Sequence, residues 1–299
     1  MTEFNLHNSQ LGKQASTPEK YDASLLFRIP RAENRVHYGI DNDSLPFVGY
    51  DVWNCYEVSF LTDNGLPVSR VLKLVYSSNS EFLVESKSLK LYLNAFNMDR
   101  FGKSVAEAET KVAQMIASDL KQLLETEVQV TFFTADSLAE KPFAEIQKTD
   151  LCDFIPGDIQ ESIKFSRFVE SPELLRSTKS GVIHEYSFHT DLLRSNCRVT
   201  NQPDWGDLFV QMSSKCDIEM SSILEYLVSF RKENHFHEEV VEMIYKRFHD
   251  FFEPSNLVVA AMYTRRGGID INPIRASHPD LIDKVLVSKT SRAEKTLRQ

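Results

Sequence analysis

Cys197 and Asp204 stand seven residues apart in a polar stretch at 194–205. A thiolate attacks an electrophilic carbon far faster than a thiol does, so a catalytic cysteine needs a partner that takes or shuttles its proton. Asp204 suits this role as proton donor or acceptor, and the pair indicates a nucleophilic centre. The alternative is an ordinary buried free thiol, which is also the interpretation for the other three cysteines, Cys55, Cys152 and Cys216.

A second candidate site lies at residues 85–90, at the start of a predicted helix, and contains Glu85, Ser86, Lys87, Ser88 and Lys90. Free backbone N–H groups, hydroxyls and ammonium groups together suit an anion such as phosphate. The alternative is a solvated first helical turn, with a capping serine and a carboxylate that is favourable to the helix dipole.

Phe236, His237 and Glu238 open another predicted helix. His237 can shuttle protons near neutral pH. Glu238 can accept two hydrogen bonds from an amidine-like edge, such as the N1–H and 2-amino groups of a guanine. An acidic cluster that complements a helix dipole is the alternative.

Two arginines, Arg265 and Arg266, precede Gly267 and Gly268 at the end of a predicted strand. Guanidinium groups in this position can clamp a phosphate. A surface turn made flexible by the two glycines is the alternative.

The composition excludes several function classes. The 299 residues include 43 acidic and 34 basic side chains, a net charge of −9, which argues against non-specific nucleic-acid binding and against a basic membrane-surface protein. No apolar run approaches the roughly 18 residues of a membrane span. The first seven residues do not resemble a secretory signal, so the cysteines are expected to be free thiols in a reducing, cytoplasmic compartment.

Common cofactor and metal motifs are also missing from the sequence. No Gly-x-Gly occurs, which removes the Rossmann fingerprint and the P-loop. No Cys-x-x-Cys or His-Glu-x-x-His occurs, and the close pair His235 and His237 supplies only two ligands, so no metal is expected.

A weak internal repeat relates the elements that must position these residues. Residues 84–96 align with 218–230, where Glu, Ser, Tyr-Leu and Phe recur in register, and 56–60 echo 184–188. Two copies of one supersecondary unit are the interpretation. Coincidence is the alternative, because only a handful of positions match.

Each copy has the pattern of strand, strand, helix, helix, strand. Alternating and helical periodicities predict strands at 52–60, 71–76 and 127–134 with helices at 89–96 and 105–123 in the first copy. The second copy predicts strands at 182–193, 208–212, 257–263 and 269–271, with helices at 220–227 and 241–252. Antiparallel hairpins with a helix pair on one face predict an α+β fold. We expect an N-terminal unit at 1–135, a linker or insertion at 136–181 and a C-terminal unit at 182–299.

The second copy is longer than the first within 194–205, which predicts a lengthened polar loop around Cys197. A loop added to a repeated scaffold is a place where function is added.

Taken together, these segments resemble one family, the 7-cyano-7-deazaguanine reductases, which are the nitrile reductases of queuosine biosynthesis. Residues 85–93 resemble the family's signature segment, and 195–206 resemble its catalytic loop. Segments 236–238 and 265–268 follow in the expected order, and 21–26 fit the long, two-module bacterial form. The resemblance covers residues from about 20 to 275 and is weakest over 136–181.

The resemblance implies two tandem tunnelling-fold units with the site at the seam between them, a homodimer, and no direct nucleic-acid or membrane partner. It implies that NADPH reduces the nitrile of 7-cyano-7-deazaguanine to an amine through a thioimide on Cys197, with Asp204 and His237 as proton donors. Glu85 and Glu238 would hold the purine-like edge, which Ser86 and Phe236 would also contact. The cofactor would contact Ser86, Lys87, Lys90, Arg265, Arg266 and Gly267.

Two other function classes stay open at this point. A cysteine-dependent nitrile hydrolase would form the same thioimide but admit water, whereas a reductase must exclude water. A non-catalytic purine-binding module would not need Cys197. A pterin or guanosine-triphosphate cyclohydrolase is disfavoured, because its metal-ligand set is missing.

Overall fold

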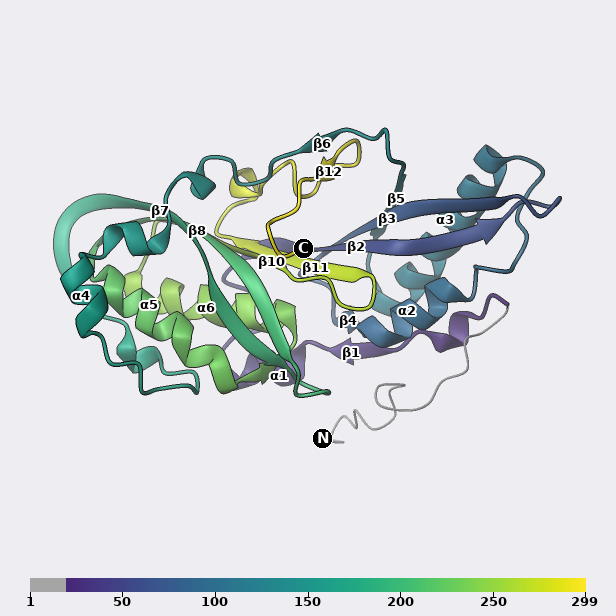
Figure 1. Ribbon diagram of the computed structural model, residues 1–299. Helices are drawn as coiled ribbons and strands as arrows, with labels where there is room; N and C mark the ends of the chain where they lie inside the picture. The colour runs from purple at the N-terminus through teal and green to yellow at the C-terminus, as the bar shows by residue number, and fades with distance from the viewer. Residues whose placement is uncertain (1–19) are drawn as a thin grey trace.

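The two repeated halves share one continuous eight-stranded sheet in the computed structural model, which describes residues 20–299 (Figure 1). The strand order is β5 (Val128–Phe133), β3 (Pro67–Ser77), β2 (Val48–Leu61), β11 (Ile269–Ala276), β10 (Asn256–Tyr263), β8 (Pro203–Ile218), β7 (Ser177–Cys197) and β9 (Asn234–His235). The pairings are antiparallel except for β7 with β9. The N-terminal segment in which no secretory signal is expected lies outside the described residues.

The pairing of β2 with β11 joins the first unit to the second at the middle of the sheet. One helix pair packs on each half: α2 (Ser86–Asn94) with α3 (Val105–Leu124), and α5 (Met220–Ser229) with α6 (His237–Phe252). Their apolar stripes form two cores with the inward-facing strand residues. The α+β expectation and the two-unit architecture are confirmed.

The internal repeat is confirmed at the level of single hydrogen bonds. Glu85 and Glu219 each precede their helix, and the backbone N–H of each donates to a carbonyl of an earlier segment, Phe27 or Arg176. Three residues on, the hydroxyls of Ser88 and Ser222 accept from the backbone N–H of these same residues, Phe27 and Arg176. Coincidence does not produce this shared bonding pattern.

The predicted 194–205 loop is wrong in extent. Strand β7 runs to Cys197 and β8 begins at Pro203, with Ser195 opposite Asp204 in the ladder. Only residues 198–202 form the turn. The strands continue here because backbone pairing does not require apolar side chains, and Cys197, Thr200 and Asp204 at this hairpin end line a cavity rather than a core.

Residues 136–181 contain β6 (Ala139–Glu140), α4 (Gly157–Ser162) and short 3₁₀ turns at Ile146–Lys148, Leu151–Phe154 and Pro172–Leu174. Phe143 packs with the C-terminal segment on the helix-free face of the sheet, and Leu151 packs with the core of the second unit. The segment is therefore packed rather than extended away from the protein.

The chain before β2 links the two helix pairs. It contains a 3₁₀ turn (Ala23–Leu25), β1 (Arg28–Pro30), which pairs with β4 (Phe82–Val84), and α1 (Ala32–His37). The guanidinium of Arg35 in α1 donates to both carboxylate oxygens of Glu242 in α6, at 2.8 and 2.7 Å. The remaining elements are 3₁₀ turns at Phe230–Lys232 and Pro279–Leu281 and the short β12 (Arg292–Ala293), which pairs with β6.

Candidate active site

A cavity of about 280 Å³ lies at the seam between the two units. The sheet contributes Trp53 from β2 and Ile269 and Ile271 from β11. Most of the residues predicted from the sequence line it, and Glu85, Ser88 and Arg265 do not: the lining includes Ser86, Lys87, Lys90, Cys197, Asp204, Phe236, His237, Glu238, Arg266 and Gly267. Residues more than a hundred positions apart therefore surround one space of the size of a small ligand site.

Cys197 is the last residue of β7 and is partly exposed at the cavity. Its backbone N–H donates to Gln202 O at 2.8 Å, and its carbonyl accepts from Asn201 N at 3.0 Å. Asn201 closes this turn with a left-handed backbone, φ 55°. The thiol therefore stands at the tip of a hydrogen-bonded hairpin, which fixes its backbone.

The other thiols are less suited to nucleophilic attack. Cys55 is buried in β2, and burial raises the pKa of its thiol well above the ordinary value. Burial also raises the pKa of Cys152, and Asp150 adds to this effect. Because a thiolate is the attacking species, these shifts disfavour both thiols.

Asp204 lies between two cationic or ionisable partners. Its Oδ1 is 2.7 Å from an Arg266 guanidinium nitrogen and 3.4 Å from His237 Nε2. The side chain is 7% exposed. The same Arg266 nitrogen also donates to Pro203 O at 2.6 Å. Arg266 therefore holds a carboxylate of the cavity, a partner that the sequence did not indicate.

His237 is the first residue of α6 and is held by ring contact. Its imidazole stacks on Tyr263 with ring centroids 3.9 Å apart, and its Nδ1 is buried without a hydrogen-bond partner among the described residues. With Nε2 beside Asp204, the imidazole is placed to exchange a proton with that carboxylate.

Glu238 follows in α6 and is 3% exposed. Burial raises its pKa to about 8, with a contribution from the negative charge of Asp51, while Arg31 and Arg275 oppose the rise. Arg275 lies 2.9 Å from Asp51, and Arg31 also pairs with this aspartate. A buried cluster of charges therefore lies behind Glu238 and controls its protonation.

The first unit contributes the beginning of α2. Both oxygens of Glu85 cap this helix by accepting from Lys87 N at 2.8 Å and Ser88 N at 2.7 Å. Burial raises the pKa of Glu85, although these hydrogen bonds oppose the shift. The carboxylate is thus committed to orienting the turn that presents Ser86 and Lys87 to the cavity.

The predicted cationic residues differ in their surroundings. Lys90 donates to Gly267 O at 2.7 Å and pairs with Glu57 at 3.2 Å. Lys87 has no carboxylate within ion-pair distance in the described part of the chain. Arg265 lies outside the cavity lining, stacked 3.9 Å from the centroid of the Tyr56 ring.

The residues of this region that sequence reasoning missed include Trp53, Thr200, His235 and Tyr263. His235 has one signal in the sequence, its two-residue spacing from His237, but that spacing points to a pair of metal ligands and not to a contact with carboxylates. Nothing in the local sequence marks the others, because their roles come from contacts with distant elements.

Within residues 20–299, no cluster of three or more His, Cys, Asp and Glu side chains is arranged to hold a metal ion. The described helices also include none with the length and apolar character of a membrane span.

Comparisons with known proteins agree with the geometry. A family model described as "Nitrile reductase, 7-cyano-7-deazaguanine-reductase N-term" matches residues 17–132, and one described as "QueF-like protein" matches 203–280. A protein named NADPH-dependent 7-cyano-7-deazaguanine reductase from Colwellia psychrerythraea is 40% identical over 271 residues, which cover 90% of this chain and 91% of that protein. Proteins of the same name from Psychrobacter cryohalolentis and Legionella pneumophila are 39% and 38% identical, over 89% and 93% of this chain and 93% and 92% of theirs.

Proposed function

The chain belongs to the family of NADPH-dependent 7-cyano-7-deazaguanine reductases, and from this premise we propose that it reduces its nitrile substrate through a covalent thioimide on Cys197. It is an NADPH-dependent oxidoreductase that converts 7-cyano-7-deazaguanine to the primary amine, a reaction of queuosine biosynthesis. The observation that supports the thioimide is the single cavity that Cys197, Asp204 and His237 share with Ser86 and Lys87 of the other unit.

Two NADPH molecules are consumed per nitrile, because a nitrile gains four electrons in becoming a primary amine and one hydride carries two. When bound, NADPH supplies the hydride; the residues of the chain bind, orient and exchange protons around it.

The first step forms a bond between Cys197 Sγ and the nitrile carbon. The thiol proton passes through Asp204 to the nitrile nitrogen, so the product is a neutral thioimide. The ion pair with Arg266 holds Asp204 in the cavity, and His237 beside it replenishes protons.

The thioimide is a better hydride acceptor than the bare nitrile. Addition of one hydride to the thioimide carbon, together with a proton to its nitrogen, gives a thiohemiaminal on Cys197. Cleavage of its carbon–sulfur bond, with return of one proton to the sulfur, leaves an imine and restores the Cys197 thiol. The second hydride, with a proton for which His237 is the proposed source, completes the amine and leaves Cys197 ready for another cycle.

Glu238 is the proposed partner of the purine-like edge, because its carboxylate is buried at the cavity and can accept two N–H groups. Phe236 offers an apolar cover from the same helix start. Glu85 is proposed to act mainly by orienting Ser86 and Lys87, with direct substrate contact as a prediction to be tested.

The cofactor phosphates are proposed to approach the start of α2, where exposed Ser86 and the ammonium of Lys87, which has no carboxylate within ion-pair distance among residues 20–299, suit an anion. Lys87 is the first candidate. Lys90 and Arg266 are already paired with Glu57 and Asp204, so they would have to exchange partners to bind phosphate.

Intact mass spectrometry tests the covalent step. The protein mixed with 7-cyano-7-deazaguanine, without cofactor, should gain one substrate mass at Cys197, and Cys197→Ala should gain none. Cys152→Ala is the matched control, because Cys152 is also partly exposed. No adduct at any pH, or an adduct on another cysteine, would contradict the mechanism. Adding NADPH should release the amine; release of a carboxylic acid would support a hydrolase.

We also propose a cytoplasmic homodimer that binds no nucleic acid directly. The four cysteines are unpaired, which suits a reducing compartment. Light scattering of the purified protein tests the dimer, and electrophoretic mobility with transfer RNA tests for nucleic-acid binding.

A further inference from the structure

His235 lines the cavity but has no part in the steps above. It lies in β9, which pairs in parallel with the end of β7, and the register places His235 opposite Cys197. It also precedes His237 by two residues. Its backbone therefore joins the nucleophile's strand to the helix that carries two further site residues.

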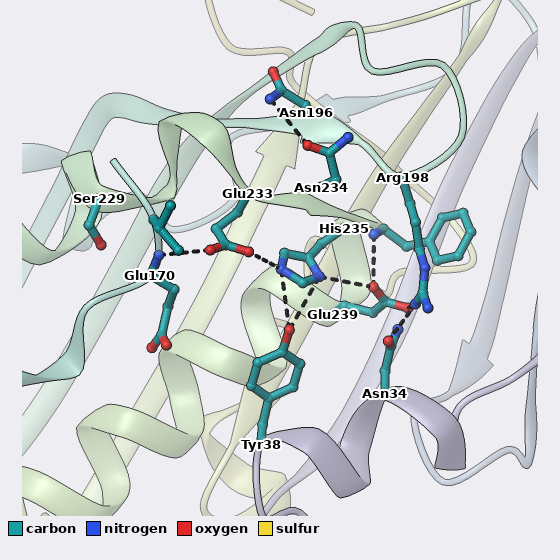
Figure 2. Close-up of polar contacts among 12 residues, drawn as sticks. Asn34, Tyr38, Glu170, Asn196, Arg198, Ser229, Glu233, Asn234, His235 and Glu239 are labelled. Carbon is teal, nitrogen blue, oxygen red and sulfur yellow. Dashed lines mark hydrogen bonds and ion pairs between the residues drawn. The ribbon is translucent and has the colours of Figure 1, made fainter. Parts of the chain in front are cut away.

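The side chain of His235 bridges two carboxylates (Figure 2). Nε2 is 2.7 Å from Glu233 Oε2, and Nδ1 is 3.5 Å from Glu239 Oε2. The hydroxyl of Tyr38, the residue that follows α1, lies 3.2 Å from Nε2. An imidazole ring can donate to two carboxylates at once only when both nitrogens carry a proton.

Glu239 extends this bridge to the residue after the nucleophile. Its Oε1 is 3.2 Å from an Arg198 guanidinium nitrogen, and its Oε2 accepts from Phe236 N at 3.0 Å. Arg198 also donates to Asn34 of α1. Figure 2 shows the resulting chain of contacts from Glu233 through His235 and Glu239 to Arg198.

Charge balance explains why the bridge requires a protonated ring. The side chains of Glu233 and Glu239 are only 17% and 6% exposed. Arg198 compensates one of them, and a neutral His235 would leave the other negative charge unpaired, which is costly in a buried place.

The pKa of His235 agrees with a protonated ring between the two carboxylates. Burial lowers the pKa of His235, but the hydrogen bonds to Glu233 and Glu239 outweigh burial and raise the pKa to about 9. The hydrogen bond from His235 lowers the pKa of Glu233 in turn. Charged and titratable groups surround the ring: Glu233, Glu239 of α6, Tyr38 directly after α1, and Arg198, with Cys197 and His237 on the cavity side.

We propose that His235, in its doubly protonated form, is a positioning residue of this enzyme. By bridging Glu233 and Glu239, it holds the end of the Cys197 strand against the first turn of α6, so that the thiol, His237 and Glu238 keep one arrangement. This inference rests on the proposed thioimide mechanism.

The sign of the pH dependence follows from the raised pKa. The ordinary pKa of histidine is 6.5, so the stabilising bridge is fully present below that value and is lost as the pH rises through about 9. A cysteine forms more thiolate as the pH rises, so this effect increases the rate of adduct formation whereas loss of the bridge decreases it.

The test is the rate of adduct formation with 7-cyano-7-deazaguanine and no NADPH, measured by stopped flow from about pH 6 to about pH 11, a range that spans the ordinary pKa values of histidine and cysteine. In the wild-type protein the rate should rise with pH and then fall above about 9. His235→Gln keeps one donor but no charge, so the rate near neutral pH should drop about 10- to 100-fold and the alkaline fall should disappear.

A second variant tests the bridge while keeping the histidine. Glu233→Gln removes the 2.7 Å partner, so the alkaline fall should begin at a lower pH than in the wild-type protein. His249→Gln is the matched control, because His249 lies in α6, outside the cavity lining, and pairs with Asp250 at 3.1 Å. It should leave rate and profile unchanged.

The outcomes separate this inference from the mechanism beneath it. If the wild-type protein forms no adduct, the proposed function is overturned. If the adduct forms and His235→Gln shares the wild-type rate and alkaline fall, or Glu233→Gln leaves that fall unmoved, the positioning role is overturned and the thioimide stands.

Discussion

The imidazole of His237 lies flat on the phenol ring of Tyr263, with the two ring planes at 12°. Gly206 of the neighbouring strand makes room for this stack, because a Cβ at that position would lie 3.1 Å from Tyr263 Cε1. The Tyr263 hydroxyl is buried and has no hydrogen-bond partner among the described residues. The ring, rather than the hydroxyl, therefore orients His237.

Tyr263→Phe should consequently leave steady-state NADPH oxidation unchanged, since it removes only an unpartnered hydroxyl. Tyr263→Leu should slow turnover and lower the free energy of unfolding by more than the about 0.5–1.5 kcal/mol of the aromatic pair, because shortening this fully buried side chain also leaves a cavity. Kinetic assays and urea unfolding measure the two effects. A slow Tyr263→Phe variant would show instead that the hydroxyl acts in the reaction.

Asp204→Asn should form the thioimide about 10²–10⁴-fold more slowly, because an amide cannot pass the thiol proton to the nitrile nitrogen. Substrate affinity should be retained, since recognition is assigned to Glu238. Stopped-flow adduct formation measures the rate. The matched control is Asp207→Asn on the same strand, where the carboxylate pairs with Arg298 at 3.1 Å. If Asp204→Asn forms the adduct at the wild-type rate but binds the substrate weakly, the roles assigned to Asp204 and Glu238 must be exchanged.

Glu238→Gln should weaken substrate binding by very roughly 1.5–3 kcal/mol, because a neutral amide replaces a charge-assisted acceptor. The pKa of about 8 sets the sign of the pH dependence: below it the carboxyl is protonated and must lose its proton to accept two N–H groups. Wild-type affinity should therefore fall as the pH drops below about 8, and the Gln variant should lose this dependence. Calorimetric titration with substrate at several pH values measures both the affinity and its pH dependence. Asp204→Asn is the control, because it retains Glu238 and should keep the wild-type pH dependence of binding.

Lys87→Ala should raise the KM for NADPH and leave adduct formation intact, because Lys87 lines the cavity and forms no ion pair with the described residues. Arg265→Ala should have a smaller effect, since this side chain stacks on Tyr56 outside the cavity lining. Lys111→Ala on α3, where the lysine pairs with Glu107, is the control. Loss of adduct formation with unchanged NADPH affinity would assign Lys87 to the substrate.

Glu85→Gln removes a carboxylate that caps two backbone N–H groups, so the free energy of unfolding should fall by about 0.5–2 kcal/mol. Glu219→Gln is the matched control from the second unit. Glu219 makes no cap bond and pairs with half-exposed Arg176, so its loss should cost about 0–1 kcal/mol. Substrate affinity should change less in Glu85→Gln than in Glu238→Gln; an equal loss would indicate that Glu85 contacts the purine edge.

The sequence by itself determined the principal strands and helices of the two units and most of the segments that form the cavity. The α2 and α6 stripes and the alternating residues of β2 arise from local periodicity, and the structure places them where that periodicity predicts. Cys197 and Asp204 stand out locally because reactive side chains share a short polar segment. The repeat was also readable, since two copies of one unit keep the residues that their packing requires.

Only the tertiary structure decided which partners these side chains have. Glu85 and Glu219 occupy the same place in the repeat, yet Arg176 engages Glu219 at 2.8 Å whereas Glu85 is left to cap its helix. Arg266 pairs with Asp204, and His235 lies between two carboxylates. Such pairings depend on distances across the sheet and between helices, because the energy of an ion pair depends on the separation of the two charges in space. Spacing along the sequence does not give this separation.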